Sequence, residues 1–292
     1  MTDISKRREF LKLGLGGAAL AGAVGVTALS TQRAAAQSAD GSLLQTVLNR
    51  GHLIVGTGST NAPWHFENDA GELVGMDITM GKILAKALFD DENAIEFVKQ
   101  DAAQRIPNIT TGRVDVSIQF MTISGARAQV VAFSRPYYVE GIALLTHPEA
   151  DIKTFDQLLE NGGSTRISIL QNVDAEKNVR LVLPEAQVMQ IDTQANVIQA
   201  LEARRVDGAA VDLSTVRWLA ARNPDRYLDS GKSWMSMLYG AALRQGDPDW
   251  QQFVDTAFAI GIHGHDTALY DSAFEEFFGA APPTRVPGFP SI

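Results

Sequence analysis

The sequence predicts an α/β protein made of two units with the same rhythm. Short apolar runs bounded by glycine or polar residues alternate with longer segments whose apolar residues recur at helical spacing. The alternation runs from residue 51 to residue 147, pauses at residues 148–151 and then starts again. Repeated strand–helix–strand patterns of this kind are typical of parallel sheets with right-handed crossovers.

The first unit alternates strands and helices up to residue 147. Asp77 is expected to cap a helix whose apolar stripe runs from Met76 to Leu88, and Gly112 is expected to end a second helix that contains Pro107. Strands are expected at 51–57, 72–74, 95–98, 116–119 and 141–147, with the second helix at 102–111.

The second unit repeats the pattern, and the chain then returns toward the first unit. Its expected helices are 155–160, 175–183, 195–203 and 214–222, and its expected strands are 166–170, 188–191 and 208–211. A strand at 238–244 runs back toward the first unit, and helices at 250–263 and 267–278 close the chain.

Composition excludes several classes of protein. With 292 residues, of which 45% are hydrophobic and 20% charged, the chain is an ordinary globular protein and not a disordered or collagen-like one. The absence of cysteine excludes disulfides, thiolate metal sites and cysteine nucleophiles. His52, His65 and His147 are scattered. His263 and His265 have a spacing that two metal ligands can use, but without cysteine or a nearby carboxylate cluster they are expected at a helix end. No Walker loop, G-x-S-x-G or H-E-x-x-H motif occurs, so we expect neither a cofactor nor a metal site.

The N-terminus reads as an export signal. KRREFLK at residues 6–12 precedes a charge-free stretch at 13–32 and the small residues Ala34, Ala35 and Ala36. The pattern resembles the twin-arginine signal, with Lys6 where Ser or Thr is usual. A membrane anchor is the alternative, but the stretch is only weakly apolar and ends in a processing site. We expect residues 1–36 to be cleaved near Ala36/Gln37 and the mature protein to be periplasmic.

Cleavage would make the chain more acidic. Residues 1–36 hold five basic and two acidic side chains, so their removal takes the formal net charge from −9 to −12. The negative electrostatic field of such an acidic chain does not favour nucleic acid binding.

The stretch at residues 116–138, which contains a polar turn, carries the clearest chemical signal. Thr122, Ser124 and Arg127 crowd around Gly125, where a strand gives way to a short helix. Free backbone N–H groups and hydroxyls at such a turn favour an anion. An arginine there can donate two hydrogen bonds to one carboxylate. We interpret this turn as the floor of a site for a small carboxylate.

Several segments together resemble the amino-acid-type (family 3) periplasmic solute-binding proteins of ABC importers. They are APWHFENDAGELVGMDI, TTGRVDVSIQFMTISGARAQVVAFSRPYY, RRVDGAAVDLST, YGAALRQGDPDW and FEEFFG, spread over about residues 52 to 279. The resemblance implies a type II periplasmic-binding-protein fold with the ligand cleft between its lobes. Lobe 1 would comprise residues 40–142 plus 240–292 and lobe 2 residues 146–236, joined by crossing strands at 141–147 and 238–243.

The resemblance also implies roles for individual residues. Arg127 matches the arginine that clamps the ligand α-carboxylate, Thr122 its neighbouring hydroxyl, and Asp212 the lobe 2 carboxylate that receives the α-ammonium. Arg105 resembles an arginine that holds a side-chain carboxylate, with an exposed helix position as the alternative, and Trp64 is expected either as an apolar wall of the site or as a core residue. Gln119, Phe120, Asn61 and Asp174 depart from commoner family residues, so we expect specificity there. Asp174 either contacts the ligand or only caps a helix.

The expected function is therefore capture of an amino acid, polar or acidic, and its delivery to the permease of an ABC importer by a monomeric binding protein. The alternative is a periplasmic cyclohexadienyl dehydratase on the same fold. The segment QNVDAEKNVR offers Asn172 and Glu176, of which Glu176 could supply the acid that an elimination needs.

Overall fold

The computed structural model describes residues 41–282 and 284–287, and the predicted signal peptide therefore lies outside the described residues. The first described helix is α2 (Leu43–Arg50). Within the described ranges, no helix has both the length and the apolar character that crossing a membrane requires.

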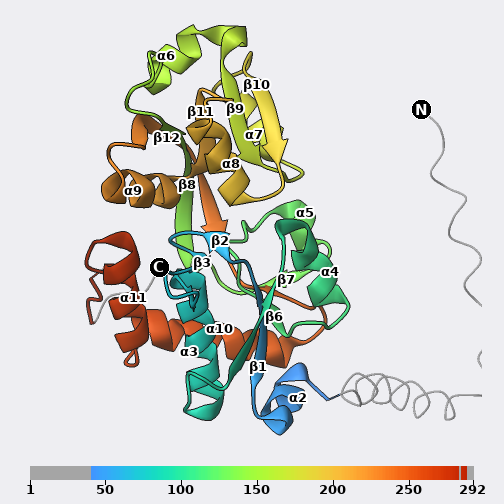
Figure 1. The fold of residues 1–292 in the computed structure, drawn as a ribbon. Helices are drawn as coiled ribbons and strands as arrows, with labels where there is room; N and C mark the ends of the chain where they lie inside the picture. The colour runs from blue at the N-terminus through green and yellow to red at the C-terminus, as the bar shows by residue number, and fades with distance from the viewer. Residues whose placement is uncertain (1–40, 283, 288–292) are drawn as a thin grey trace, which may run out of the picture. The chain divides into compact units, whose positions relative to one another are not determined.

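The first sheet takes strands from both halves of the chain. Its order is β5-β1-β6-β13-β7, with β1 parallel to β5 and β6, and β13 antiparallel to β6 and β7. The strands are β1 (Leu53–Thr57), β5 (Ile95–Lys99), β6 (Val116–Ser117), β7 (Ala132–Phe133) and β13 (Ala242–Leu243). We call the part of the molecule built on this sheet lobe 1 (Figure 1).

Helices of lobe 1 come from early and late in the chain. Helix α3 (Met76–Phe89) packs against α10 (Pro248–His263) and α11 (Ala268–Phe278). Gly75, just before α3, has φ 127°, and a Cβ atom there would lie 2.3 Å from the carbonyl oxygen of Trp64, so the close approach requires glycine. The remaining elements are β2 (Thr60–Asn61), β3 (His65–Glu67), β4 (Leu73–Val74), η1 (Ala102–Gln104), α4 (Arg105–Thr110) and α5 (Gly125–Ala128).

The second sheet has the order β10-β9-β11-β8-β12, and we call the part built on it lobe 2. Its strands are β8 (Tyr138–Thr146), β9 (Arg166–Leu170), β10 (Gln187–Ile191), β11 (Gly208–Asp212) and β12 (Leu228–Tyr239). Strand β9 is parallel to β10 and β11, whereas β8 is antiparallel to β11 and β12. The helical elements of lobe 2 are α6 (Phe155–Glu160), η2 (Gly162–Ser164), α7 (Ala175–Arg180), α8 (Gln194–Glu202) and α9 (Leu213–Arg222).

Two strands carry the chain between the lobes. Strand β8 follows β7 of lobe 1, and β12 leads back to β13. They lie side by side in Figure 1 and pair from Thr146 opposite Leu228 to Tyr138 opposite Tyr239. The prediction of a two-lobed α/β protein is confirmed, and the paired strands form the connection between its halves.

The sequence interpretation was wrong in two places that matter for the site. The second crossing strand begins at Leu228 and ends at Tyr239, earlier than the expected 238–243, because register shifts at Asp229/Ser233 and Trp234/Met237 break its alternation. Asp77 does not cap α3, since the N-cap position is Gly75 and Asp77 lies in the first turn with its side chain fully buried.

Candidate functional site

A cavity of about 420 Å³ lies between the lobes, and we call it the main cavity. Six of the predicted site residues line it: Arg105, Phe120, Thr122, Arg127, Asp174 and Asp212. Strands β8 and β12 contribute Ile142 and the segment 235–239. Residues from both lobes and from the connecting strands therefore meet around one volume.

Arg127 is held by the turn that precedes it. The Ser124 side chain caps α5 by accepting a hydrogen bond from the Arg127 backbone N–H (3.4 Å), and the Arg127 guanidinium donates to the Thr122 carbonyl oxygen (2.7 Å). Partial burial lowers the pKa of Arg127, and the Asp174 carboxylate opposes this shift. In the part of the chain that the structure describes, no carboxylate forms an ion pair with Arg127. Its charge is thus oriented but not neutralised.

Arg105 supplies a second cation, and it is more deeply buried. Its side chain donates to the carbonyl oxygens of Ala102 (2.9 Å) and Gln119 (3.1 Å), and its guanidinium lies over the ring of Phe120. Burial, followed by the charge of Arg127, lowers the pKa of Arg105 to about 10, so the group stays charged at neutral pH. A buried cation bonded only to carbonyl oxygens favours an anion in the adjoining cavity.

Asp212 brings the opposite charge from lobe 2. It ends strand β11, and its Oδ2 atom is buried without a hydrogen-bond partner among the described residues. Burial, and next the neighbouring Glu140, raises the pKa of Asp212 well above its usual value, while a hydrogen bond from the Tyr239 hydroxyl acts the other way. A carboxylate in this state lacks a cationic partner, which a ligand ammonium would supply.

Glu140 and Tyr239 were not singled out by sequence reasoning. Glu140 lies on β8 and accepts hydrogen bonds from the Ser214 hydroxyl (2.5 Å) and from the backbone N–H of Gly141 (2.9 Å). Its burial raises its own pKa. Tyr239 lines the main cavity and bonds Asp212. Both lie on the strands that connect the lobes. The only sequence signal for them was their position within YYVEGIALL and LYGAALR.

Asp77 fixes the loop that carries Phe120. Its Oδ2 atom accepts hydrogen bonds from His65 Nδ1 (2.8 Å) and from the Phe120 backbone N–H (2.8 Å), and its Oδ1 atom accepts one from the Tyr137 hydroxyl (3.0 Å). Phe120 has φ 35°, a conformation that needs such support. Its ring stacks on His65 with 4.7 Å between centroids.

We expect Asp77→Asn to destabilise the protein by about 1–2 kcal/mol, because an amide turns charge-assisted hydrogen bonds into neutral ones and offers one acceptor oxygen instead of two. Urea unfolding measures the effect. Asp69→Asn, at an exposed turn, is the matched control and should stay within about 0.5 kcal/mol of the wild type. Equal unfolding midpoints for both variants would contradict the assigned role.

Asp174 lies in the main cavity, in front of helix α7. It occupies the N-cap position of that helix, yet its side chain makes no capping hydrogen bond. The bond at this turn runs from its backbone N–H to Asn172 Oδ1 (3.0 Å). The Asp174 carboxylate therefore does not cap helix α7, which was one of its two expected roles. It instead attracts the Arg127 guanidinium electrostatically.

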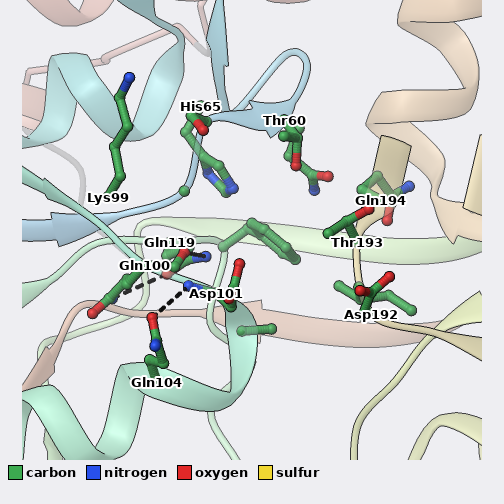
Figure 2. Close-up of a pocket in the computed structure, with 16 residues that line it drawn as sticks. Thr60, His65, Lys99, Gln100, Asp101, Gln104, Gln119, Asp192, Thr193 and Gln194 are labelled. Carbon is green, nitrogen blue, oxygen red and sulfur yellow. Dashed lines mark hydrogen bonds between the residues drawn. The ribbon is translucent and has the colours of Figure 1, made fainter. Parts of the chain in front are cut away.

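A smaller cavity of about 180 Å³, which we call the second cavity, adjoins the main one (Figure 2). Phe120, Leu170 and Gln194 line both. The predicted specificity residues Asn61 and Gln119 line the second cavity only. The structure thus distributes the predicted residues over two adjoining volumes.

Trp64 is not brought to either cavity. Its side chain is 0% exposed and packs edge-on against Tyr138 and Tyr239. Its Nε1 donates to the Ser214 hydroxyl of lobe 2 (2.9 Å), which in turn donates to Glu140. Of the two roles expected for Trp64, the structure shows the core position, from which the side chain joins the two lobes.

Glu176, the acid considered for the dehydratase alternative, is not part of the site. The Glu176 side chain is 48% exposed, pairs with Arg180 on the same helix (2.7 Å) and lines neither cavity. Asn172 does line the main cavity. Among the described residues, no group of three or more His, Cys, Asp or Glu side chains is arranged to hold a metal ion.

The chain is similar to several known proteins. The family model "Bacterial extracellular solute-binding proteins, family 3" matches residues 53–275. The L-cystine-binding protein TcyJ of Escherichia coli is 30% identical over 91% of this chain and 97% of its own length. The glutamine-binding protein of Geobacillus stearothermophilus is 32% identical over 66% of this chain and 73% of its own length.

One solved structure bears on the enzymatic alternative. The ancestral amino acid-binding protein AncCDT-1, described as a precursor of cyclohexadienyl dehydratase, is 27% identical with a TM-score of 0.71, over 81% of this chain and 100% of that one. That protein is thus named as a binding protein, although it is described as the precursor of an enzyme.

Proposed function

This chain belongs to the bacterial extracellular solute-binding proteins of family 3, and we propose that it captures a polar or acidic amino acid between its lobes and delivers it to the permease of an ABC importer. Its relatives are named as amino-acid-binding proteins, so the chain is a binding protein rather than an enzyme. The observation that carries the proposal is one cavity in which Arg127 of lobe 1 and Asp212 of lobe 2 each lack an ion-pair partner among residues 41–282 and 284–287.

The ligand would form ion pairs with the charged residues of the main cavity. Its α-carboxylate accepts hydrogen bonds from Arg127 and from the Thr122 hydroxyl, with Arg105 as a second cation close by. Its α-ammonium pairs with Asp212, which then loses its proton. Since the two charged ends are held by different lobes, a zwitterion stabilises the closed arrangement more than the open one. Closure buries the ligand for transport, and opening at the permease releases it.

We further propose the location and partners of the mature protein. Residues 1–36 would direct export through the twin-arginine route, and cleavage near Gln37 would release a periplasmic monomer. The permease partner follows from the family, whose named members include an ABC transporter glutamine-binding protein. Dehydratase activity is not favoured, because Glu176 is exposed, paired with Arg180 and outside both cavities.

A thermal-shift screen of the purified mature protein over the common amino acids tests the binding role. A ligand at about 100 times its Kd adds about 2.7 kcal/mol of stability, which is roughly 5–10 °C in a protein of this size. We expect at least one amino acid to stabilise the protein, while its decarboxylated amine and its α-keto acid do not. Stabilisation by the amine or the keto acid alone would contradict the zwitterion site, and product formation from prephenate or arogenate would contradict the binding role.

A further inference from the structure

The second cavity contains a buried amide with unmet hydrogen-bonding capacity. Asn61 is 2% exposed, and both its Oδ1 and Nδ2 atoms are buried without a partner among the described residues. Most buried polar groups in proteins are hydrogen-bonded, and leaving one unpaired costs about 1–3 kcal/mol. Asn61 lines the second cavity, so a molecule in that cavity can supply both partners once the buried amide turns toward it.

The neighbouring amides are already bonded to one another. Gln100 Nε2 donates to Ser117 Oγ (2.8 Å) and to Gln119 Oε1 (3.0 Å), and Gln119 Nε2 donates to the Gln100 carbonyl oxygen (3.2 Å). Figure 2 shows the Gln100 and Gln119 side chains together in this network. The amides of Gln100 and Gln119 therefore have hydrogen-bond partners within the protein, whereas the buried amide of Asn61 has none among the described residues.

The buried part of the second cavity carries no net charge. His65 is held by Asp77 through Nδ1, and burial lowers the pKa of His65, which favours its neutral form at neutral pH. The Lys99 ammonium pairs with Glu67 at the surface, and Asp101 and Asp192 are exposed. Both arginines of the site line the main cavity and not this one. An ionised group placed against Asn61 would lose its hydration without meeting a buried counter-charge.

The second cavity is also placed to receive the far end of a ligand. It shares Phe120, Leu170 and Gln194 with the main cavity. Gln194, largely buried, and Thr193 come from lobe 2, whereas Thr60 and Asn61 come from lobe 1. A side chain that extends from the main cavity past Phe120 would reach residues of both lobes.

Resting on the proposed function, we infer that the second cavity binds the side-chain end of the amino acid and selects a neutral group that both donates and accepts, a carboxamide or a ureido group. The carbonyl oxygen of such a group accepts from Asn61 Nδ2, and its N–H donates to Asn61 Oδ1. A carboxylate would set its lone pairs against Oδ1, and a guanidinium or ammonium would leave Nδ2 unpaired. Arg105, confined to the main cavity, then acts on the α-carboxylate rather than on a side-chain carboxylate.

Calorimetric titration of a matched ligand series tests this inference. The series is glutamine, glutamate, norleucine, citrulline and arginine, with alanine as a ligand that has the zwitterion but no side-chain end group. We expect the wild type to bind glutamine and citrulline at least about tenfold more tightly than glutamate and arginine, respectively. Binding of glutamate equal to or tighter than that of glutamine would overturn the inference.

Substitutions assign the preference to Asn61. Asn61→Leu should weaken glutamine and citrulline at least about tenfold while norleucine and alanine keep their affinity. Asn61→Asp, which keeps the size, should reverse the preference for citrulline over arginine, because a carboxylate accepts from a guanidinium but cannot donate to the ureido carbonyl oxygen, and it serves if the leucine variant does not fold. Asn93→Leu, at an exposed loop position, is the control. An unchanged preference in the folded Asn61 variants would overturn the inference.

The outcomes separate this inference from the function on which it rests. If alanine and the other zwitterions bind but the end group makes no difference, only the selection by Asn61 fails. If no amino acid binds at all, the proposed function fails, and this inference fails with it.

Discussion

Replacing Arg127 by alanine is expected to raise the Kd for the amino acid by more than about 100-fold, which corresponds to about 3 kcal/mol or more of binding free energy. Arg127 is oriented by the Ser124 cap and the Thr122 carbonyl oxygen, and within the described part of the chain it forms no ion pair with a carboxylate. Its remaining donors are therefore available to a carboxylate in the main cavity. Without them, the buried ligand carboxylate would keep only Arg105 and the Thr122 hydroxyl nearby.

Isothermal titration calorimetry of the variant measures this loss. Arg127→Lys should recover part of the affinity, because the charge remains while the two parallel hydrogen bonds do not. Arg113→Ala removes an exposed arginine and should bind as the wild type does. The unfolding midpoint of unliganded Arg127→Ala should not fall, since the wild-type cation is partly buried and forms no ion pair among the described residues. Wild-type affinity in a folded Arg127→Ala protein would place the carboxylate site elsewhere.

The features that the sequence predicted well are those carried by local pattern. The alternation of strand and helix signals located nearly every element of both lobes, because period and chain direction determine where a parallel sheet places its loops. Asp212 was identified by its resemblance to a family residue, and its position as the last residue of strand β11 is consistent with that role. Arg127 was identified from local pattern, by hydroxyls and a glycine at a strand-to-helix turn.

The features that it predicted poorly depend on contacts between distant segments. Trp64 is adjacent in sequence to residues that line the second cavity, but its indole N–H bonds Ser214, which lies 150 positions away. Asp77 has the sequence context of a helix cap, whereas its partners come from β3, the Phe120 turn and Tyr137. Strand β12 was placed too late because bulges interrupt its alternation. No local pattern specifies these long-range partners.

Asp212→Asn is the second variant with a large expected effect, and it should act in opposite directions on ligand binding and on the stability of the unliganded protein. Affinity should fall by roughly 100-fold, since an amide cannot neutralise the α-ammonium. The unliganded variant should be more stable than the wild type at neutral pH, because the wild type must bury either a charge or a proton taken up by Asp212. Asp225→Asn, at an exposed lobe 2 position, is the control for both measurements.

The pH dependence follows from the direction of the shift. The charged and titratable groups that act on Asp212 are Glu140 on β8, Tyr239 on β12, Asp77 on α3 and Arg105 on α4, and their balance with burial leaves its pKa well above the usual value. The folded protein therefore binds a proton that the unfolded chain has released, so the stability that this proton contributes is present at low pH and is lost as pH rises. The stability advantage of Asp212→Asn should accordingly grow from acid toward neutral pH.

Binding of an α-ammonium should lower the pKa of Asp212, because a buried cation favours the ionised carboxylate. Amino acid binding should therefore release protons from the wild type, and titration calorimetry in two buffers of different ionisation enthalpy measures how many. Because Glu140 interacts strongly with Asp212, the released protons belong to the pair. The Asp212→Asn variant should release far fewer. Equal proton release by both proteins would show that Asp212 does not receive the ammonium, whatever the variant does to affinity.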